Sequence, residues 1–216
     1  MTVYLMSVTE AKKIGKKFCI ENFPIRYEKA MRKKNKKDAM LSVASGTLIS
    51  SILKISEADI KLNEHGKPYT DTKKIHFSIS HSGEYAAAAV SNGEIGIDIE
   101  LVKKRNYKLV KKICTADEYK WVSEDFENNF FELWTLKESV LKAVGTGFSA
   151  SPKNFSLMPY LMNGERINAG NMNLYAKSMY YGGYCISAVC EDEFSKLDIV
   201  RIGYDLHSGK IITDKT

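Results

Sequence analysis

The sequence has few of the features that mark secreted or membrane proteins. It contains four cysteines and four prolines among 216 residues, and no cysteines stand in a Cys-x-x-Cys pair. Neither a zinc site nor a disulfide framework is therefore indicated. No apolar run is long enough to cross a membrane, and the N-terminus lacks the basic start and apolar core of a signal peptide. We expect a cytoplasmic protein in a reducing compartment, with no membrane partner.

The composition is that of a globular protein with an uneven positive charge. Hydrophobic residues make up 44% and charged residues 27%, and the length suits one large domain or two small ones. The net charge of +6 gathers in residues 26–37 and in Lys103–Lys112. Such segments are solvated helix faces, or they attract nucleic acid, phosphorylated small molecules or acidic proteins. Few aromatic residues lie among these lysines, which argues against a site for single-stranded nucleic acid.

A strand with two carboxylates is predicted at residues 95–100. Isoleucine there alternates with Gly96, Asp98 and Glu100, so both acids lie on one face and the isoleucines on the other. Gly96 should leave space beside the acids for a bound group. The Asn-Gly pair at 92–93 predicts a hairpin with the preceding alanine-rich strand. The acidic face is either solvated or a magnesium site, since magnesium takes one or two carboxylates and completes its shell with water and phosphate.

A helix is predicted at residues 130–144, where apolar residues recur at helical spacing. Lys137 falls within the apolar stripe, where a charge needs a partner or must extend to a cleft. Glu138 and Lys142 are four residues apart and neighbour each other at the edge of the stripe. An ordinary surface ion pair would explain them. Together with the acidic strand, they point to a metal ion and a phosphate.

The remaining pattern predicts an α+β protein. Residues 83–90 and 182–189 echo each other, which favours two related halves or arises by chance. If the halves are related, the site would lie at their seam. Strands are expected near residues 3–8, 75–80, 85–91, 155–158, 173–178, 184–189 and 197–204, and helices near residues 9–19, 27–53 with a break near Asn35, 107–113 and 116–124.

Four motifs in this order resemble the 4′-phosphopantetheinyl transferases of the longer Sfp type. They are Gly66-Lys67-Pro68, the segment 77–83 (Phe-Ser-Ile-Ser-His-Ser-Gly), Gly96-Ile97-Asp98-Ile99-Glu100, and Trp134-Thr135-Leu136-Lys137-Glu138-Ser139 with Lys142. The resemblance implies a monomer of two similar α/β halves, a pseudo-duplicated fold in which each half is a small, mostly antiparallel sheet packed by helices. The halves would be residues 1–102 and 103–216, with the active site at their seam.

The resemblance implies that the protein is a holo-[carrier protein] synthase. Such an enzyme transfers 4′-phosphopantetheine from coenzyme A to a serine of an apo acyl or peptidyl carrier protein and releases adenosine 3′,5′-bisphosphate. It uses Mg²⁺, with Mn²⁺ as a substitute, and serves pathways such as secondary metabolite biosynthesis. By position, Asp98, Glu100 and Glu138 would hold the metal, with Glu100 bound directly or through water.

Further roles follow from position in the motifs. Lys142 would bind the pyrophosphate or stabilise the leaving group. Glu118 would take the serine proton, unless Glu138 or a metal-bound water does so. Lys137 would be a second cation near the phosphates or a structural partner of the cleft. The residues expected to bind coenzyme A are Arg26, Lys29, Ser42, Lys67, Ser80, His81, Lys137 and Lys142.

Two positions depart from the family pattern. Leu41 stands where the family often has an arginine, and Arg26 replaces an expected lysine, which keeps the charge and changes the geometry. Carrier proteins usually present an acidic helix, and we expect Lys103–Lys112 to attract it during a transient encounter.

Two other function classes remain open. The first is another metal-dependent phosphoryl-transfer enzyme, and the second is a basic module that binds nucleic acid. The Gly-Lys-Pro and Ser-His-Ser-Gly segments argue against both, because neither function requires them. We therefore expect no nucleic-acid partner.

Overall fold

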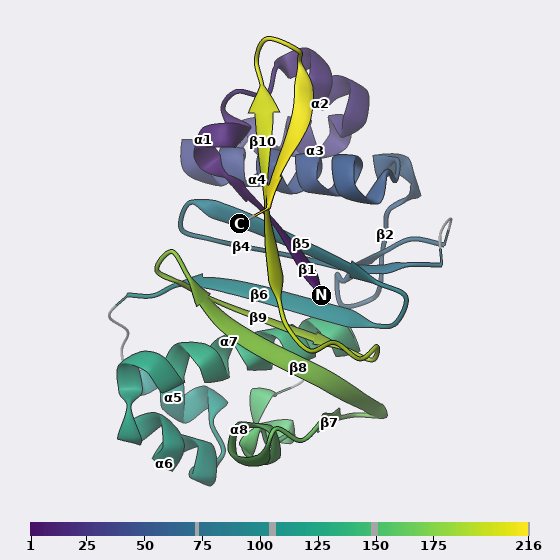
Figure 1. The fold of residues 1–216 in the computed structure, drawn as a ribbon. Coiled ribbons are helices and arrows are strands. Elements are labelled where there is room, and N and C mark those ends of the chain that lie inside the picture. The colour runs from purple at the N-terminus through teal and green to yellow at the C-terminus, as the bar shows by residue number, and fades with distance from the viewer. Residues whose placement is uncertain (72–73, 104–106, 148–150, 216) are drawn as a thin grey trace.

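A computed structural model describes residues 1–71, 74–103, 107–147 and 151–215 of the chain. Two sheets stack between two groups of helices, so that the molecule has four layers (Figure 1). The predicted α+β class is confirmed. The first sheet has the order β11-β10-β1-β5-β4, and the second has the order β6-β9-β8-β7.

The first sheet contains strands from both ends of the chain. β1 pairs in parallel with β10 and antiparallel with β5, so that residues 198–215 complete a sheet begun at residue 2. A division of the chain at residue 102 stays a prediction. The strands are β1 (Thr2–Ser7), β4 (His76–Ser82), β5 (Tyr85–Ser91), β10 (Asp198–Asp205) and β11 (Lys210–Lys215).

Helices from the N-terminal part cover the outer face of the first sheet. The Asn35 side chain accepts a hydrogen bond from the Lys37 backbone and starts α4, which confirms the break predicted at this residue. The helices are α1 (Val8–Ala11), α2 (Lys16–Asn22), α3 (Pro24–Met31) and α4 (Lys36–Leu48), followed by a π-helical turn at Ile49–Leu53 and a short 3₁₀ helix at Glu57–Asp59.

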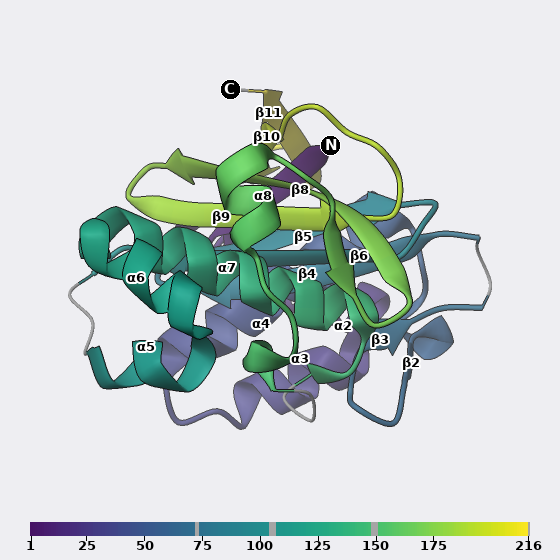
Figure 2. The same ribbon diagram turned by 90° about the horizontal axis from the view of Figure 1, so that it is seen from below.

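The second sheet is covered on its outer face by α5 to α8, as Figure 2 shows. Its strands are β6 (Ile95–Leu101), β7 (Ile167–Ala169), β8 (Met172–Tyr181) and β9 (Tyr184–Cys190). The helices are α5 (Tyr107–Ile113), α6 (Ala116–Glu124), α7 (Phe126–Val144) and α8 (Met158–Asn163). A two-stranded hairpin, β2 (Lys61–Leu62) and β3 (Pro68–Tyr69), lies outside both sheets.

The two sheets bury a shared apolar core. The isoleucines of β6 pack with residues of the first sheet such as Val3, Leu5 and Ala87. Tyr85 and Tyr184, which occupy matching places in the two echoing segments, contact edge to face with ring centroids 5.2 Å apart. The common origin of the two halves stays a prediction.

The hairpin predicted at residues 92–93 is wrong. β5 and β6 belong to different sheets, and β6 pairs with β9 over its whole length. The Asn-Gly turn carries the chain from one sheet to the other. It is held there by Asp192, whose carboxylate accepts the backbone N–H of Gly93 at 2.9 Å. The alternating pattern identified both strands but not the partner of either.

The strand predicted at residues 155–158 is also wrong. A 3₁₀ turn at Pro152–Asn154 precedes this segment, and α8 begins at Met158. The N–H of Leu157 donates to Glu118, and the carbonyl of Phe155 accepts from Lys137. Side chains therefore form the hydrogen bonds with backbone groups that a neighbouring strand would otherwise form. Among the described residues, none of the helices is both long enough and apolar enough to cross a bilayer.

Candidate active site

Serine side chains join the edges of the two sheets. β4 lies beside β6, and three serines alternate along β4 with period two. The hydroxyl oxygen of Ser78 accepts the N–H of Ile97 at 3.0 Å, and that of Ser82 accepts the N–H of Leu101 at 3.1 Å. Ser80 donates to Oδ1 of Asp98 at 2.6 Å. The serine side chains thus join β4 to β6 where backbone hydrogen bonds would join two strands of one sheet, and they orient the acidic strand.

The acidic strand and α7 are in direct backbone contact. A Cβ on Gly96 would lie 1.8 Å from the carbonyl oxygen of Ser139, so only glycine permits this approach. The expectation that Gly96 leaves space for a bound group is wrong, because the helix occupies that space. The close contact brings Glu138 and Lys142 of α7 to the face of β6 that carries Asp98.

Asp98 is the centre of the site. Its Oδ1 accepts from Ser80 and from the ammonium of Lys142, each at 2.6 Å. The same ammonium donates to the carbonyl of Ile97 at 3.0 Å. Asp98 is 5% exposed, so this charge is buried and depends on these partners.

Two carboxylate oxygens in the site have no hydrogen-bond partner among the described residues. They are Oδ2 of Asp98 and Oε1 of Glu138, and both atoms are buried. Burial, and then the charge of Asp98, raise the pKa of Glu138 to about 7. Leaving buried acceptors without a partner costs free energy, and a divalent cation bound by both oxygens would be the missing partner. The donor set therefore fits a hard metal ion such as Mg²⁺.

Glu100 lies on the same strand and is held by protein donors. Its Oε2 accepts from Ser82 at 2.8 Å, and its Oε1 accepts from the indole of Trp134 at 3.4 Å. In the part of the chain that the structure describes, no three histidine, cysteine or acidic side chains are already arranged as a metal site. The case for a metal rests on the orphaned oxygens of Asp98 and Glu138, beside Glu100.

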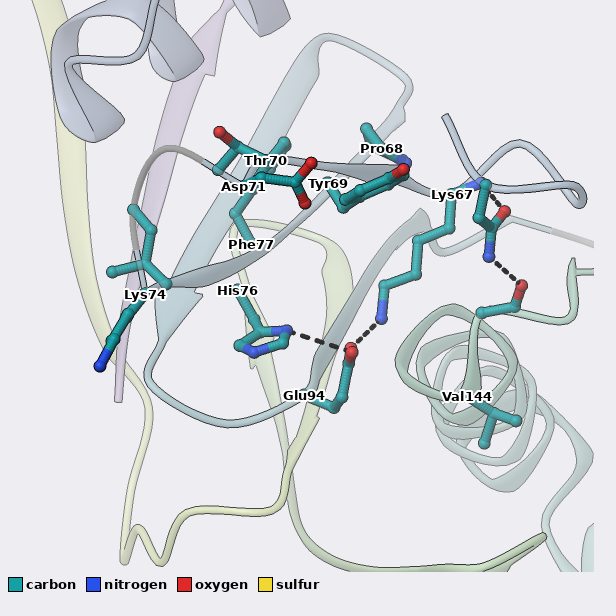
Figure 3. A pocket seen from close by; sticks show the side chains of 13 residues that line it. Lys67, Pro68, Tyr69, Thr70, Asp71, Lys74, His76, Phe77, Glu94 and Val144 are labelled. Atoms are coloured by element: carbon teal, nitrogen blue, oxygen red, sulfur yellow. Dashed lines mark hydrogen bonds and ion pairs between the residues drawn. The ribbon is translucent and has the colours of Figure 1, made fainter. Parts of the chain in front are cut away.

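A cavity of about 380 Å³ opens beside these residues. Such a volume is within the range of small-molecule sites. Glu138 and Lys142 line one side, and Arg26 lines it from α3. The other lining residues come from β4, from the β2–β3 hairpin, and from α7 and the segment that follows it. A second cavity of about 370 Å³ adjoins it and shares Lys67 and Phe77 (Figure 3).

The expected nucleotide-binding residues divide between the cavity and its surroundings. His81 lies between Ser80 and Ser82 on β4, and its pKa is lowered by desolvation and by the charges of Lys33 and Lys142. Lys33 donates to Ser42 at 2.6 Å. Lys33 was missed from the sequence because nothing distinguishes it from its neighbours in a basic run. Lys29 is exposed on α3.

Leu41, the departure from the family arginine, is buried in α4. The basic stretch expected to meet a carrier protein lies partly outside the described residues. Lys104 and Arg105 are not described, and neither is the side chain of Lys108. Lys111 and Lys112 are exposed in the last turn of α5.

Glu118 and Lys137 form a buried ion pair. Lys137 Nζ lies 2.9 Å from Oε1 of Glu118, and both side chains are 0% exposed. The ammonium also donates to the carbonyls of Pro152 and Phe155 at 2.6 and 2.9 Å. Burial lowers the pKa of Lys137, and Glu118 opposes that effect. This arrangement accounts for the charge within the apolar stripe.

Both oxygens of Glu118 have structural partners. Oε1 accepts from the backbone of Leu157, and Oε2 closes the capping box of α6 by accepting the N–H of Thr115 at 2.8 Å. The sequence led us to expect a proton acceptor here, and the structure places a structural carboxylate instead. Lys137 likewise binds groups of the protein, and it does not line the cavity that Glu138 lines.

Comparison with known proteins shows a family similarity over part of the chain. The model of the 4′-phosphopantetheinyl transferase superfamily matches residues 94–188, the stretch that carries both the acidic strand and α7. This stretch of the chain is therefore similar to the 4′-phosphopantetheinyl transferase superfamily. The Gly-Lys-Pro and Ser-x-Ser segments precede the matched stretch.

Several curated relatives carry the same family name. The chain is 41% identical over 123 residues to 4′-phosphopantetheinyl transferase gsp of Aneurinibacillus migulanus, which covers 52% of each protein. It is 32% identical over 145 residues to 4′-phosphopantetheinyl transferase Sfp of Bacillus subtilis (strain 168), covering 62% of this chain and 65% of the relative. The chain thus spans between half and two thirds of the length of these relatives. These matches confirm the predicted Sfp-type resemblance.

Proposed function

We propose that this protein transfers 4′-phosphopantetheine from coenzyme A to a serine of an apo acyl or peptidyl carrier protein. The observation that carries the proposal is the pair of orphaned oxygens on Asp98 and Glu138, next to Lys142 in a cavity large enough for a small molecule. Proteins named as transferases of this kind share the surrounding sequence. A phosphoryl-transfer site needs this combination of anionic metal ligands and a cation.

In the proposed reaction, the serine hydroxyl attacks the phosphorus next to pantetheine. A new P–O bond forms to serine, and the bond to the adenosine 3′,5′-bisphosphate leaving group breaks. Asp98, Glu138 and Glu100 would hold Mg²⁺, which when bound neutralises charge on the pyrophosphate. Lys142 supports Asp98 and offers a cation to the leaving phosphate.

The serine proton needs an acceptor, and Glu138 is better placed than Glu118 to provide it. Glu138 lines the cavity and has an oxygen with no hydrogen-bond partner among the described residues. Both oxygens of Glu118 are occupied. If Glu138 instead serves only to hold the metal, a water molecule would take the serine proton.

The nucleotide of coenzyme A is proposed to lie near the positive groups of the N-terminal half. Arg26 lines the cavity, and His81 lies within the electrostatic reach of Lys33 and Lys142. Ser42, held by Lys33, adds a hydroxyl to this group. These residues would bind phosphate oxygens, which accept hydrogen bonds and attract cations.

The carrier protein is proposed to dock transiently on the basic stretch Lys103–Lys112. The effect should fall mainly on the association rate, because exposed charges steer an encounter more than they strengthen a complex. Replacing Lys111 and Lys112 with glutamate should raise the KM for the carrier at low salt and leave the KM for coenzyme A unchanged. The matched control is K210E/K215E on β11, since both lysines there are exposed as well. Equal carrier kinetics in the two variants would exclude this docking surface.

The deciding experiment is mass spectrometry of a purified apo carrier protein incubated with coenzyme A and Mg²⁺. We expect the carrier to gain one phosphopantetheine group, and we expect a chelator to prevent the gain. An unmodified carrier in every case, with the protein folded, would exclude the proposed activity. The four cysteines are free and buried, which suits the reducing cytoplasm in which we place this reaction.

A further inference from the structure

The β2–β3 hairpin is attached to the C-terminal end of α7. The side-chain amide of Asn63 donates to the carbonyl of Gly145 at 2.8 Å, and its Oδ1 accepts the N–H of Lys67 at 2.8 Å. Gly145 has φ +77°, and a Cβ there would lie 3.1 Å from both Asn63 Nδ2 and Lys67 Cδ. Because Gly145 has no side chain, it both ends the helix and lets the hairpin pack closely against the helix end.

The ammonium of Lys67 is bound by two groups of the protein. It donates to the carbonyl of Ala143 at 2.7 Å and forms an ion pair with Glu94. Figure 3 shows Lys67 and His76 approaching the Glu94 carboxylate from opposite sides. His76 Nδ1 lies 3.1 Å from Oε1 of Glu94. The side chains of Lys67 and Glu94 are 15% and 29% exposed, so solvent screens this pair only in part.

The partners of Lys67 belong to the two elements that carry the candidate active site. Glu94 immediately precedes β6, which bears Asp98. Ala143 follows Lys142 on α7, and its carbonyl is one of the last-turn acceptors that an α-helix leaves unsatisfied. A lysine at this end also interacts favourably with the helix dipole. One ammonium thus connects the beginning of the acidic strand to the end of the helix.

We propose that Lys67 is a positioning residue that fixes α7 against β6, and so sets the distance from Asp98 to Glu138 and Lys142. The inference rests on the proposed transferase function for its kinetic consequences. It differs from the direct role expected for Lys67, in which the ammonium would bind coenzyme A. A phosphate bound by Lys67 would have to compete with Glu94 and the carbonyl of Ala143 for the same donor.

The two roles predict different kinetics. Loss of a positioning group lowers kcat, since a small misplacement near the reacting atoms slows the chemical step. Loss of a group that binds the substrate equally in ground and transition states raises KM. For K67M we expect kcat to fall about ten- to a hundred-fold, with the KM for coenzyme A changing less than about two-fold. E94Q should show the same pattern more weakly, and K67R should restore part of kcat.

The matched control is K61M in the same hairpin. Lys61 pairs with Asp71, and both side chains are more than half exposed. Its loss should leave kcat unchanged. K67M/E94Q should be no slower than K67M alone, because residues that act through one contact are not additive. A rise in the KM for coenzyme A with kcat unchanged in K67M would overturn the proposal.

A second measurement needs no transfer activity. Amide hydrogen exchange of residues 141–147 should be faster in K67M and in E94Q than in the wild-type protein and K61M, because the helix end loses its attachment. Unchanged exchange would also overturn the proposal. If the wild-type protein modifies no carrier, the proposed function fails, while hydrogen exchange still decides whether Lys67 holds α7. If K67M fails to fold, E94Q carries both tests.

Discussion

Lys142 Nζ lies 2.6 Å from Oδ1 of Asp98, although the two residues are 44 positions apart in the chain. The lysine side chain is 29% exposed and the aspartate side chain is 7% exposed. The pair therefore has one member in the protein interior and one that reaches the cavity. This geometry lets Lys142 compensate the buried charge of Asp98 and also face a bound phosphate.

Removing the charge of Asp98 should stop the transfer reaction without unfolding the protein. D98N keeps the shape of the side chain and removes a metal ligand. We expect the transfer rate to fall by at least about a hundred-fold, the loss typical of one electrostatic group in an active site. Mass spectrometry of the carrier gives the rate, and circular dichroism checks the fold. K196M, which alters an exposed ion pair, is the control. A D98N rate within a few-fold of wild type would contradict the metal assignment.

E138Q should make the metal-free protein more stable at high pH. The pKa of Glu138 is raised above its ordinary value of 4.5 to about 7, so the folded state holds this proton more tightly than the unfolded state. Stability should therefore fall as the pH rises through this range. Glutamine carries no charge at any of these pH values, so E138Q should not show this fall in the free energy of unfolding, which is on the order of 1–3 kcal/mol.

Thermal unfolding in a chelator tests this expectation. A chain of this size gains about 2–4 °C in Tm for each kcal/mol. E138Q should unfold above the wild-type protein at pH 8 and close to it at pH 4.5, while transfer activity is lost. A lower Tm than wild type at pH 8 would show that the buried Glu138 charge is not destabilising.

Breaking the buried pair of Lys137 and Glu118 should destabilise the fold. K137M leaves the Glu118 charge without its partner, and such losses cost about 3–5 kcal/mol. K137M/E118L removes both charges and should recover much of that stability. Urea unfolding measures the free energy of unfolding of both variants.

E118Q should transfer phosphopantetheine at close to the wild-type rate per folded molecule. A loss of a hundred-fold or more would show instead that Glu118 is a catalytic residue.

His81 should make the binding of coenzyme A depend on pH. Desolvation, Lys33 and Lys142 lower the pKa of His81 below 6.5 in the free protein, while Asp38 acts in the opposite direction. The free protein should therefore lose stability as the pH falls below 6.5. A bound phosphate favours the charged imidazole, so His81 should take up a proton on binding.

Calorimetry of coenzyme A binding in two buffers of different ionisation enthalpy measures that proton uptake. We expect uptake near pH 6.5 in the wild-type protein and a smaller value in H81Q. The phosphate of coenzyme A also titrates, but its contribution is the same for the wild-type protein and H81Q and cancels when the two are compared at each pH. Equal uptake in the two proteins would exclude His81 from the phosphate site.

Local patterns predicted the elements of the site well. Alternation of isoleucine with glycine and acids identified β6, and the apolar stripe identified α7. Asn35 marked the start of α4 because its side chain caps the helix within the same short segment. Residues 94–188, which carry two of the four motifs, match the model of the 4′-phosphopantetheinyl transferase superfamily. Each of these features depends on neighbours within a few residues.

Contacts between distant segments were decided by the tertiary structure. The sequence showed which face of β6 was apolar, but not that β9 would pair with it or that α7 would fill the space beside Gly96. It marked Lys137 as a charge in an apolar stripe, but not Glu118 as its partner. Periodicity determines the direction of each side chain along its own element. The partner that covers that side chain depends on how elements far apart in the chain pack together.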